Sequence, residues 1–146
     1  MNRSTIIRTK IFEALNGFDY SGKVIPVFDE VVNPDASLPS VGGAEEVYII
    51  LQDQQQNPNA VQPYCDPRFN LNITIRVVTK WGLTGSKKLC ESIGDAILKL
   101  IRTDRSGSKI DGISKIELPV SQTISETTKT NLSYSNINIL NCIYNG

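Results

Sequence analysis

The clearest pattern in the chain is an alternation of apolar and polar positions between residues 69 and 81. The apolar set is Leu71, Ile73, Ile75 and Val77, and the polar set is Asn70, Asn72, Thr74 and Arg76. This period of two predicts a strand with one face on the core and the other in water, as in an antiparallel sheet. A second apolar run over residues 46–53 predicts its hairpin partner. The connection, residues 54–67, is long and rich in Gln, Asn and Pro.

Two segments have the periodicity of an amphipathic helix. In residues 5–16 the apolar stripe is Ile7, Ile11, Ala14 and Leu15, with Ser4 as the expected cap and Gly17 as the stop. In residues 86–103 the apolar face is Leu89, Ile93, Ala96, Ile97, Leu100 and Ile101. Ser86 is the expected cap of this second helix, which we expect to cover the core.

Three further strands complete the expected fold. Residues 23–32 are β-branched but contain Pro26, which predicts an edge strand or a bulge. Residues 115–125 and 132–144 predict a closing strand pair with a polar tip at 126–131. The order is α-β-β-β-α-β-β. We therefore expect a single α+β domain over residues 1–146, with a mostly antiparallel sheet, long hairpins and the main helix on one sheet face.

Charge and cysteine content narrow the classes of function. Fifteen Lys and Arg balance fifteen Asp and Glu, so net charge gives no reason to expect tight binding to a phosphate backbone. No stretch approaches the roughly 18 apolar residues of a membrane span, and the first residues lack a signal-peptide core. Cys65, Cys90 and Cys142 have no metal-type spacing, and we expect reduced thiols in a cytoplasmic setting.

The residues needed for catalysis are not evident. Histidine is absent, and the adjacent acidic pairs at 29–30 and 45–46 would point to opposite strand faces. Cys65 has no base nearby in sequence, and Gly82 and Gly85 lack the lysine of a phosphate-binding loop. We therefore predict that the chain is not an enzyme, with no catalytic residue, cofactor or metal. Trp81 is expected to anchor the end of its strand.

Residues 69–102, a long alternating strand followed by Trp81-Gly82, a short turn and a Leu/Ile-faced helix, resemble the tail terminator or tail-completion proteins of tailed bacteriophages. The resemblance extends as architecture over nearly the whole chain. It implies a homo-oligomeric ring, most often a hexamer, with a dodecamer as the alternative. Such a ring ends tail polymerisation, docks the tail on portal and neck proteins, and lets genomic DNA pass without sequence recognition. The expected location is the virion, after assembly in the bacterial cytoplasm and without a membrane.

The same expectation follows from the strands themselves. Strands that outrun the core need partners for their backbone groups, and a neighbouring subunit can supply them by strand addition. A head-to-tail contact closes into a ring where its rotation closes. The residues we expect to contact partners lie on two polar projections: Gln54, Gln55, Gln56, Asn57, Asn59, Gln62, Tyr64, Glu126, Thr128, Lys129 and Asn131.

Two other interpretations remain open from the sequence. The chain is alternatively another tail-tube, neck or adapter subunit, which would form tubes instead of a closed ring. It is otherwise a stand-alone module that binds a protein or a single-stranded nucleic acid on its sheet. That last interpretation needs basic residues around the sheet aromatics.

Overall fold

The computed structural model describes residues 3–29, 38–56, 68–82, 85–103, 107–127 and 131–145. Its elements are α1 (Arg3–Leu15), β1 (Asp19–Tyr20), β2 (Lys23–Val24), β3 (Val27–Asp29), β4 (Glu46–Gln56), β5 (Arg68–Trp81), α2 (Lys87–Ile101), β6 (Ile113–Thr127) and β7 (Leu132–Asn145). The chain is an α+β protein with a mostly antiparallel sheet, so the predicted fold class is confirmed.

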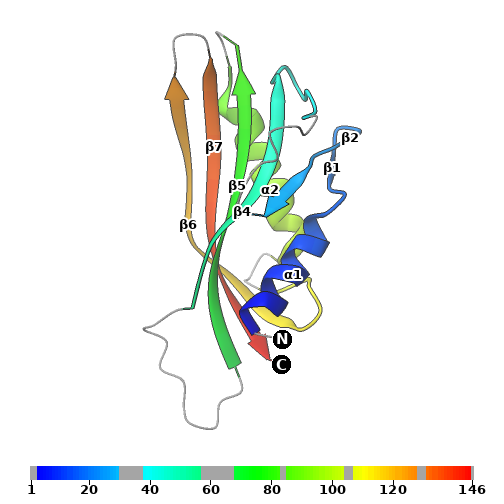
Figure 1. The fold of residues 1–146 in the computed structure, drawn as a ribbon, viewed down its shortest axis with the longest axis vertical. Helices are drawn as coiled ribbons and strands as arrows, with labels where there is room; N and C mark the ends of the chain where they lie inside the picture. Colours follow the sequence, from blue (N-terminus) through cyan, green and yellow to red (C-terminus); the bar gives the residue numbers. More distant parts are fainter. Residues whose placement is uncertain are drawn as a thin grey trace.

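The main sheet has five strands in the order β3-β4-β5-β7-β6, and β1 and β2 form a separate small ribbon. All neighbours in the main sheet are antiparallel except β3 and β4, which are parallel. The last strand, β7, is inserted between β5 and β6. Both helices pack on one side of the sheet, here called the helix face, while the opposite side is called the outer face (Figure 1).

The core lies between the helices and β4, β5 and β7. Leu71, Ile73, Ile75 and Val77 are fully buried there, so the predicted core side of β5 is confirmed. Trp81 is also buried at the end of β5, where its indole N–H donates to Thr79 Oγ1 at 3.1 Å. This agrees with its expected role as an anchor.

Helix α2 is the lid that the sequence predicted. The Ser86 hydroxyl accepts a hydrogen bond from the Lys88 amide at 3.2 Å, which confirms Ser86 as the N-cap. The buried side is Cys90, Ile93, Gly94, Ile97 and Ile101. Leu100, predicted on the buried face, is 44% exposed. The residues of α2 that face the sheet are instead those at positions 90, 94, 97 and 101.

Helix α1 starts earlier than predicted, at Arg3, so Ser4 lies inside the helix and is not its cap. The apolar stripe is confirmed in part, since Ile7, Ile11 and Leu15 are fully buried and Ala14 is partly exposed. The stop is confirmed, because Gly17 has a φ of 81°, in the left-handed region that favours glycine.

The strand predicted over residues 23–32 is interrupted. Ser21 and Gly22 both have positive φ and turn the chain so that β2 pairs with β1, which the sequence did not predict. The chain then leaves this ribbon at Ile25 and Pro26 and enters the main sheet as the three-residue β3. Pro26 therefore marks a break, and β3 is the edge strand that it predicted. Residues 30–32 lie outside the described residues.

The long strands extend beyond their predicted ends. β4 continues through Gln56, with Gln55 opposite Asn72 and Gln56 opposite Leu71 after a register shift. Pairing with β5 thus outweighs the polar composition that predicted a loop from residue 54. β6 likewise continues through Glu126 and Thr127, which the sequence placed in the hairpin tip.

The outer face is less exposed to water than the alternation in β5 predicted. Tyr48, Ile50 and Val78 form a second small cluster there, covered by Phe28 and Leu38. Even Thr74, in the polar set of β5, is only 8% exposed. The cluster is shielded because the side chains of Phe28, on the edge strand β3, and Leu38 pack against it.

Candidate interaction surface

The β6–β7 half of the sheet points its aliphatic side chains away from the protein's own helices. Ile139 lies opposite Val120 in the ladder and Ile137 lies opposite Gln122, two residues further along. The same register places Ile124 beside Ser135. These residues share the outer face with Thr74 and Arg76, their partners on β5. We call Val120, Ile124, Ile137 and Ile139 the aliphatic strip.

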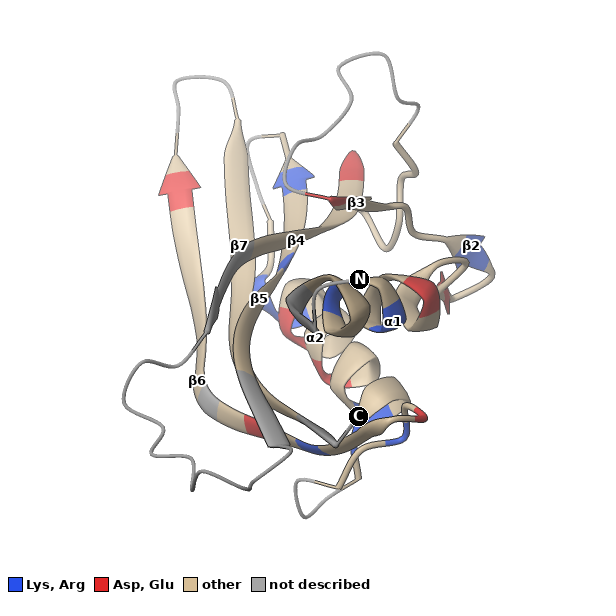
Figure 2. Ribbon diagram, turned by 60° about the horizontal axis from the view of Figure 1, so that its bottom comes forward, with Lys and Arg blue, Asp and Glu red and all other residues tan. Residues whose placement is uncertain are grey.

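The strip is accessible from outside. Val120 is 40% exposed, and the other three side chains are partly exposed. β7 contains no charged residue, and neither does β6 between residues 118 and 125. Figure 2 accordingly shows the middle of both strands without basic or acidic colour, while charge gathers on the helices and at strand ends.

The helix face of the same two strands carries a hydrogen-bonded polar network. Asn138 donates to Asn136 Oδ1 at 2.6 Å, and Asn136 donates to Thr123 Oγ1 at 3.1 Å. The Ser121 hydroxyl donates to Asn138 Oδ1 at 2.7 Å. Asn136 and Asn138 are almost fully buried, and these bonds offset the cost of their desolvation. The network therefore fixes which side of β7 faces the helix.

A hollow of about 280 Å³ lies on the outer face near the tip of the β6–β7 hairpin. It is lined by Tyr48, Arg76, Val78, Lys80, Glu126, Asn131 and Ser133. Its two cations have carboxylate partners at long range, Arg76 with Glu126 and Lys80 with Glu46, each at 3.7 Å. Arg76 also donates to Ser135 Oγ at 2.9 Å, and the Lys80 ammonium lies 5.7 Å from the Tyr48 ring centre.

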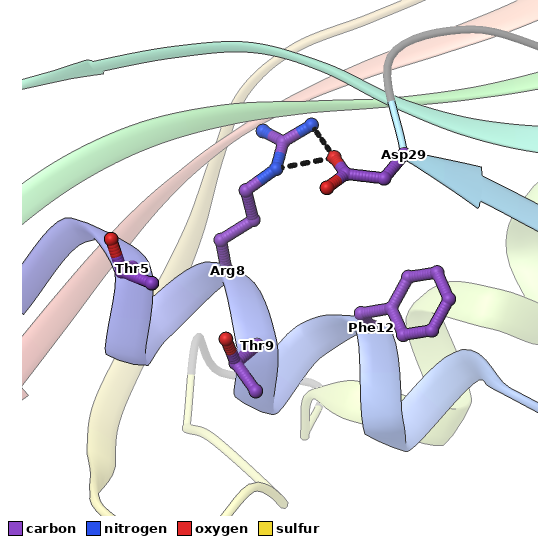
Figure 3. A pocket seen from close by; sticks show the side chains of 5 residues that line it. All are labelled: Thr5, Arg8, Thr9, Phe12 and Asp29. Atoms are coloured by element: carbon purple, nitrogen blue, oxygen red, sulfur yellow. Dashed lines mark hydrogen bonds and ion pairs between the residues drawn. The ribbon is translucent and has the colours of Figure 1, made fainter.

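A second hollow, of about 240 Å³, lies beside α1 and is lined by Thr5, Arg8, Thr9, Phe12 and Asp29. Figure 3 shows the Arg8 guanidinium reaching from α1 to Asp29 at the end of β3. Its Nε donates to Asp29 at 2.6 Å, and a terminal nitrogen donates to the Leu51 carbonyl at 2.8 Å. Arg8 thus joins α1 to two strands, which is a structural role.

The structure brings together two of the predicted contact residues, Glu126 and Asn131, at the rim of the outer-face hollow. Gln54, Gln55 and Gln56 belong to β4 instead of a loop. The remaining predicted contact residues lie outside the described residues: Asn57, Asn59, Gln62, Tyr64, Thr128 and Lys129.

The aliphatic strip was not found from the sequence. Its signal is the Ser-Asn-Ile-Asn-Ile run at 135–139, whose period of two does not say which set faces the helices. Isoleucine is normally expected on the buried side of a strand. In the structure Asn136 and Asn138 are buried, whereas Ile137 and Ile139 are partly exposed. The matching Val-Ser-Gln-Thr-Ile run at 120–124 becomes informative only when β6 and β7 are paired in register.

The described thiols are chemically quiet. Cys90 and Cys142 are free and buried, and burial raises the pKa of Cys90 to about 11 and that of Cys142 to about 12. Cys65 lies outside the described residues. Within the described ranges, no three His, Cys, Asp or Glu side chains gather to hold a metal ion. In that part of the chain, no helix is both long and apolar enough to cross a membrane.

Comparison of the sequence with models of known protein families, and with curated protein sequences, found no match.

Proposed function

We propose that this chain is a structural virion protein that forms a homo-oligomeric ring at the head–tail junction of a tailed bacteriophage. In this role it caps the tail and docks it to the head connector while leaving a channel for DNA. The hexamer is the expected ring, and neighbouring neck and tail proteins are the expected partners.

The aliphatic strip carries the self-assembly part of the proposal. A strand pair buried only by its own helices would turn Ile137 and Ile139 toward them and leave Asn136 and Asn138 in water. The chain does the opposite, and it stabilises the buried amides by hydrogen bonds. Aliphatic residues on an open part of the sheet, where β7 and residues 118–125 of β6 carry no charge, favour burial against another protein surface.

Charge placement and element order also support the proposal. The zero net charge of the chain suits a particle through which DNA must slide without sticking. The two cations that line the outer-face hollow, Arg76 and Lys80, have carboxylate partners, which counts against a basic stacking platform for single strands there. The Arg102 side chain donates to the Ile116 carbonyl at 3.1 Å, so this cation serves the fold. The long hairpin followed by α2 and a closing pair is the order that the family resemblance rests on.

The test is negative-stain imaging of the purified chain at rising concentration, alone and with tail tubes. We expect closed rings with a central hole wide enough for a DNA duplex, either in solution or on the tube end. The double variant Ile137→Thr/Ile139→Thr keeps β-branched strand residues while removing apolar area, so it should fold and lose ring formation. Ser133→Thr, on the same strand and outer face but outside the strip, is the matched control.

The same images separate the other interpretations. Tubes that lengthen with concentration would indicate a tail-tube subunit in place of a terminator. Neither rings nor tube-end binding, together with binding to a single-stranded oligonucleotide, would overturn the proposal in favour of a stand-alone binding module.

A further inference from the structure

The C-terminal half of β6 is an unprotected sheet edge. β6 is the last strand of the sheet, and no described element lies beyond its upper half in Figures 1 and 2. Over residues 120–127 the strand has no proline, and Glu126 is its only charge. All eight side chains are exposed except those of Thr123 and Ile124, which are partly exposed. A long, regular edge of this kind is a template for pairing with another strand.

The other sheet edges in the described part of the chain are protected. β3 is three residues long, follows Pro26 and ends at Asp29, which Arg8 holds. The first half of β6 carries register shifts on both sides of Lys115–Glu117, and Lys115 already bridges to Gly107. Short strands, bulges and proline are the usual ways in which proteins block edge pairing. β4 continues beyond Leu51, where its pairing with β3 ends, and carries a register shift between Gln52 and Gln55. Of these described edges, only residues 120–127 lack such a feature.

The backbone groups that face this open edge can be identified. The Cys90 thiol lies 3.3 Å from the Val77 carbonyl oxygen and 3.6 Å from that of Tyr134, so both carbonyls point into the gap between β5 and β7. The backbone groups of successive residues point to opposite edges of a strand. The N–H and C=O groups of Ser133, Ser135, Ile137 and Ile139 therefore point toward β6. Their β6 partners are Glu126, Ile124, Gln122 and Val120. The residues between them are Ser121, Thr123, Ser125 and Thr127. Their backbone N–H and C=O groups therefore point away from β7, toward the open edge, and these four are called the outward residues.

We propose that a second copy of this chain pairs antiparallel along this edge, β6 to β6, about a two-fold axis at Ile124. In this register Ser121 faces Thr127 and Thr123 faces Ser125, so every outward residue has a hydrogen-bonded partner. Moving one chain along by two residues either places Thr127 against Pro119, which has no N–H, or places Ile124 against Glu126.

The same register matches the side chains. Ile124 meets its own copy on the outer face, and Gln122 lies opposite Glu126, so an amide faces a carboxylate and no like charges oppose each other. The two five-stranded sheets become continuous, and the two aliphatic strips join across the axis. A two-fold contact closes on itself. It therefore differs from the contact that would close a ring, and the proposal does not depend on the proposed function.

The first test is the solution mass by light scattering. We expect the mass of the wild-type chain to rise first to twice its 16.1 kDa, at concentrations below those at which any ring forms. Ser125→Pro removes an outward N–H without touching the β6–β7 ladder, and should give a folded monomer by mass and circular dichroism. Ser125→Ala keeps the N–H and should remain dimeric. A wild-type chain that stays monomeric up to its solubility limit would overturn the proposal, as would a folded Ser125→Pro dimer.

The second test reads the register by cross-linking and does not depend on how proline is tolerated. In a Cys65→Ser background the remaining thiols, Cys90 and Cys142, are buried. Ile124→Cys should form an inter-chain disulfide, because a non-hydrogen-bonded pair has Cα atoms about 4.5 Å apart, within bridging range. Ser125→Cys should cross-link poorly, because its copy lies on a diagonal about 7–8 Å away. Equal cross-linking of both variants, or none at Ile124→Cys, would contradict this interface.

Discussion

Gly94 in α2 faces Asn136 in β7 at such close range that a β-carbon at position 94 would overlap the Asn136 amide. Asn136 cannot easily move, because it is 6% exposed and bonded to both Asn138 and Thr123. A glycine in the middle of a helix thus permits the helix to approach a strand that carries polar side chains. This contact links the position of α2 to the orientation of β7.

Gly94→Ala should therefore destabilise the protein. Overpacking costs about 1–3 kcal/mol, and an overlap this severe belongs in the upper part of that range, about 2–3 kcal/mol, whereas alanine gains only about 1 kcal/mol of helix propensity over glycine. We expect a net loss of about 1–2 kcal/mol in the free energy of unfolding, measured by urea denaturation. In the double variant Gly94→Ala/Asn136→Ala the two losses of stability should not add. The second substitution removes the amide with which the new β-carbon would overlap. A Gly94→Ala variant as stable as the wild type would contradict the close approach.

Ile75→Asp should abolish folding. Ile75 is fully buried in the middle of β5, and an unpaired carboxylate there costs more than about 4 kcal/mol, a large part of a typical stability of about 5–15 kcal/mol. The measurement is thermal melting by circular dichroism. Asn72→Asp is the control on the outer face of the same strand, where a carboxylate can still accept the 2.9 Å hydrogen bond from Asn141. Its cost should stay near or below about 1 kcal/mol.

Arg8→Ala should weaken the attachment of α1 to the sheet and lower the free energy of unfolding by about 1–2 kcal/mol, since it removes the donor to the Leu51 carbonyl. The ion pair contributes less, because the Asp29 side chain is 59% exposed and screened by water. Asp29→Asn should therefore cost under about 1 kcal/mol in urea denaturation, and salt should change wild-type stability little. If Asp29→Asn were as costly as Arg8→Ala, the ion pair, and not the bond to the Leu51 carbonyl, would be the main contribution of Arg8 to stability.

Because of its two buried thiols, we expect the protein to lose stability in alkaline solution. Folding raises the pKa of Cys90 from 9.0 to about 11 and that of Cys142 from 9.0 to about 12. Above pH 9 the unfolded chain releases these protons while the folded chain keeps them, so the free energy of unfolding falls as pH rises toward 11 and 12. Cys142→Ala should reduce the slope of that fall, measured by denaturation across this range.

The same thiols should be unreactive in the folded protein. In a Cys65→Ser background at about pH 8, a thiol reagent should label neither Cys90 nor Cys142 until denaturant is added, because both remain protonated and buried. Rapid labelling without denaturant would show that α2 opens from the sheet.

The sequence was sufficient to predict the strands and helices that bury a single apolar face. In β5 the alternation of aliphatic residues with Asn and Thr identified the strand and its buried side, and the 3.6-residue periodicity identified α2 with its Ser86 cap. These features are local, since each requires only that one apolar face be buried. Pairing with β5 extended β4 through Gln56 against its polar composition, and no local signal could predict that.

The sequence by itself determined the fold class, the long hairpin and the helix that covers it, because hydrophobic periodicity specifies one buried face per element. Only the tertiary structure decided that β7 enters between β5 and β6, that Asn136 and Asn138 face the helix, and that Ile137 and Ile139 face outward. A period of two divides a strand into two faces without saying which is the inner one. The choice depends on what packs across from it, here Gly94 of α2 and the hydroxyls of β6, which are distant in sequence and meet only in the folded chain.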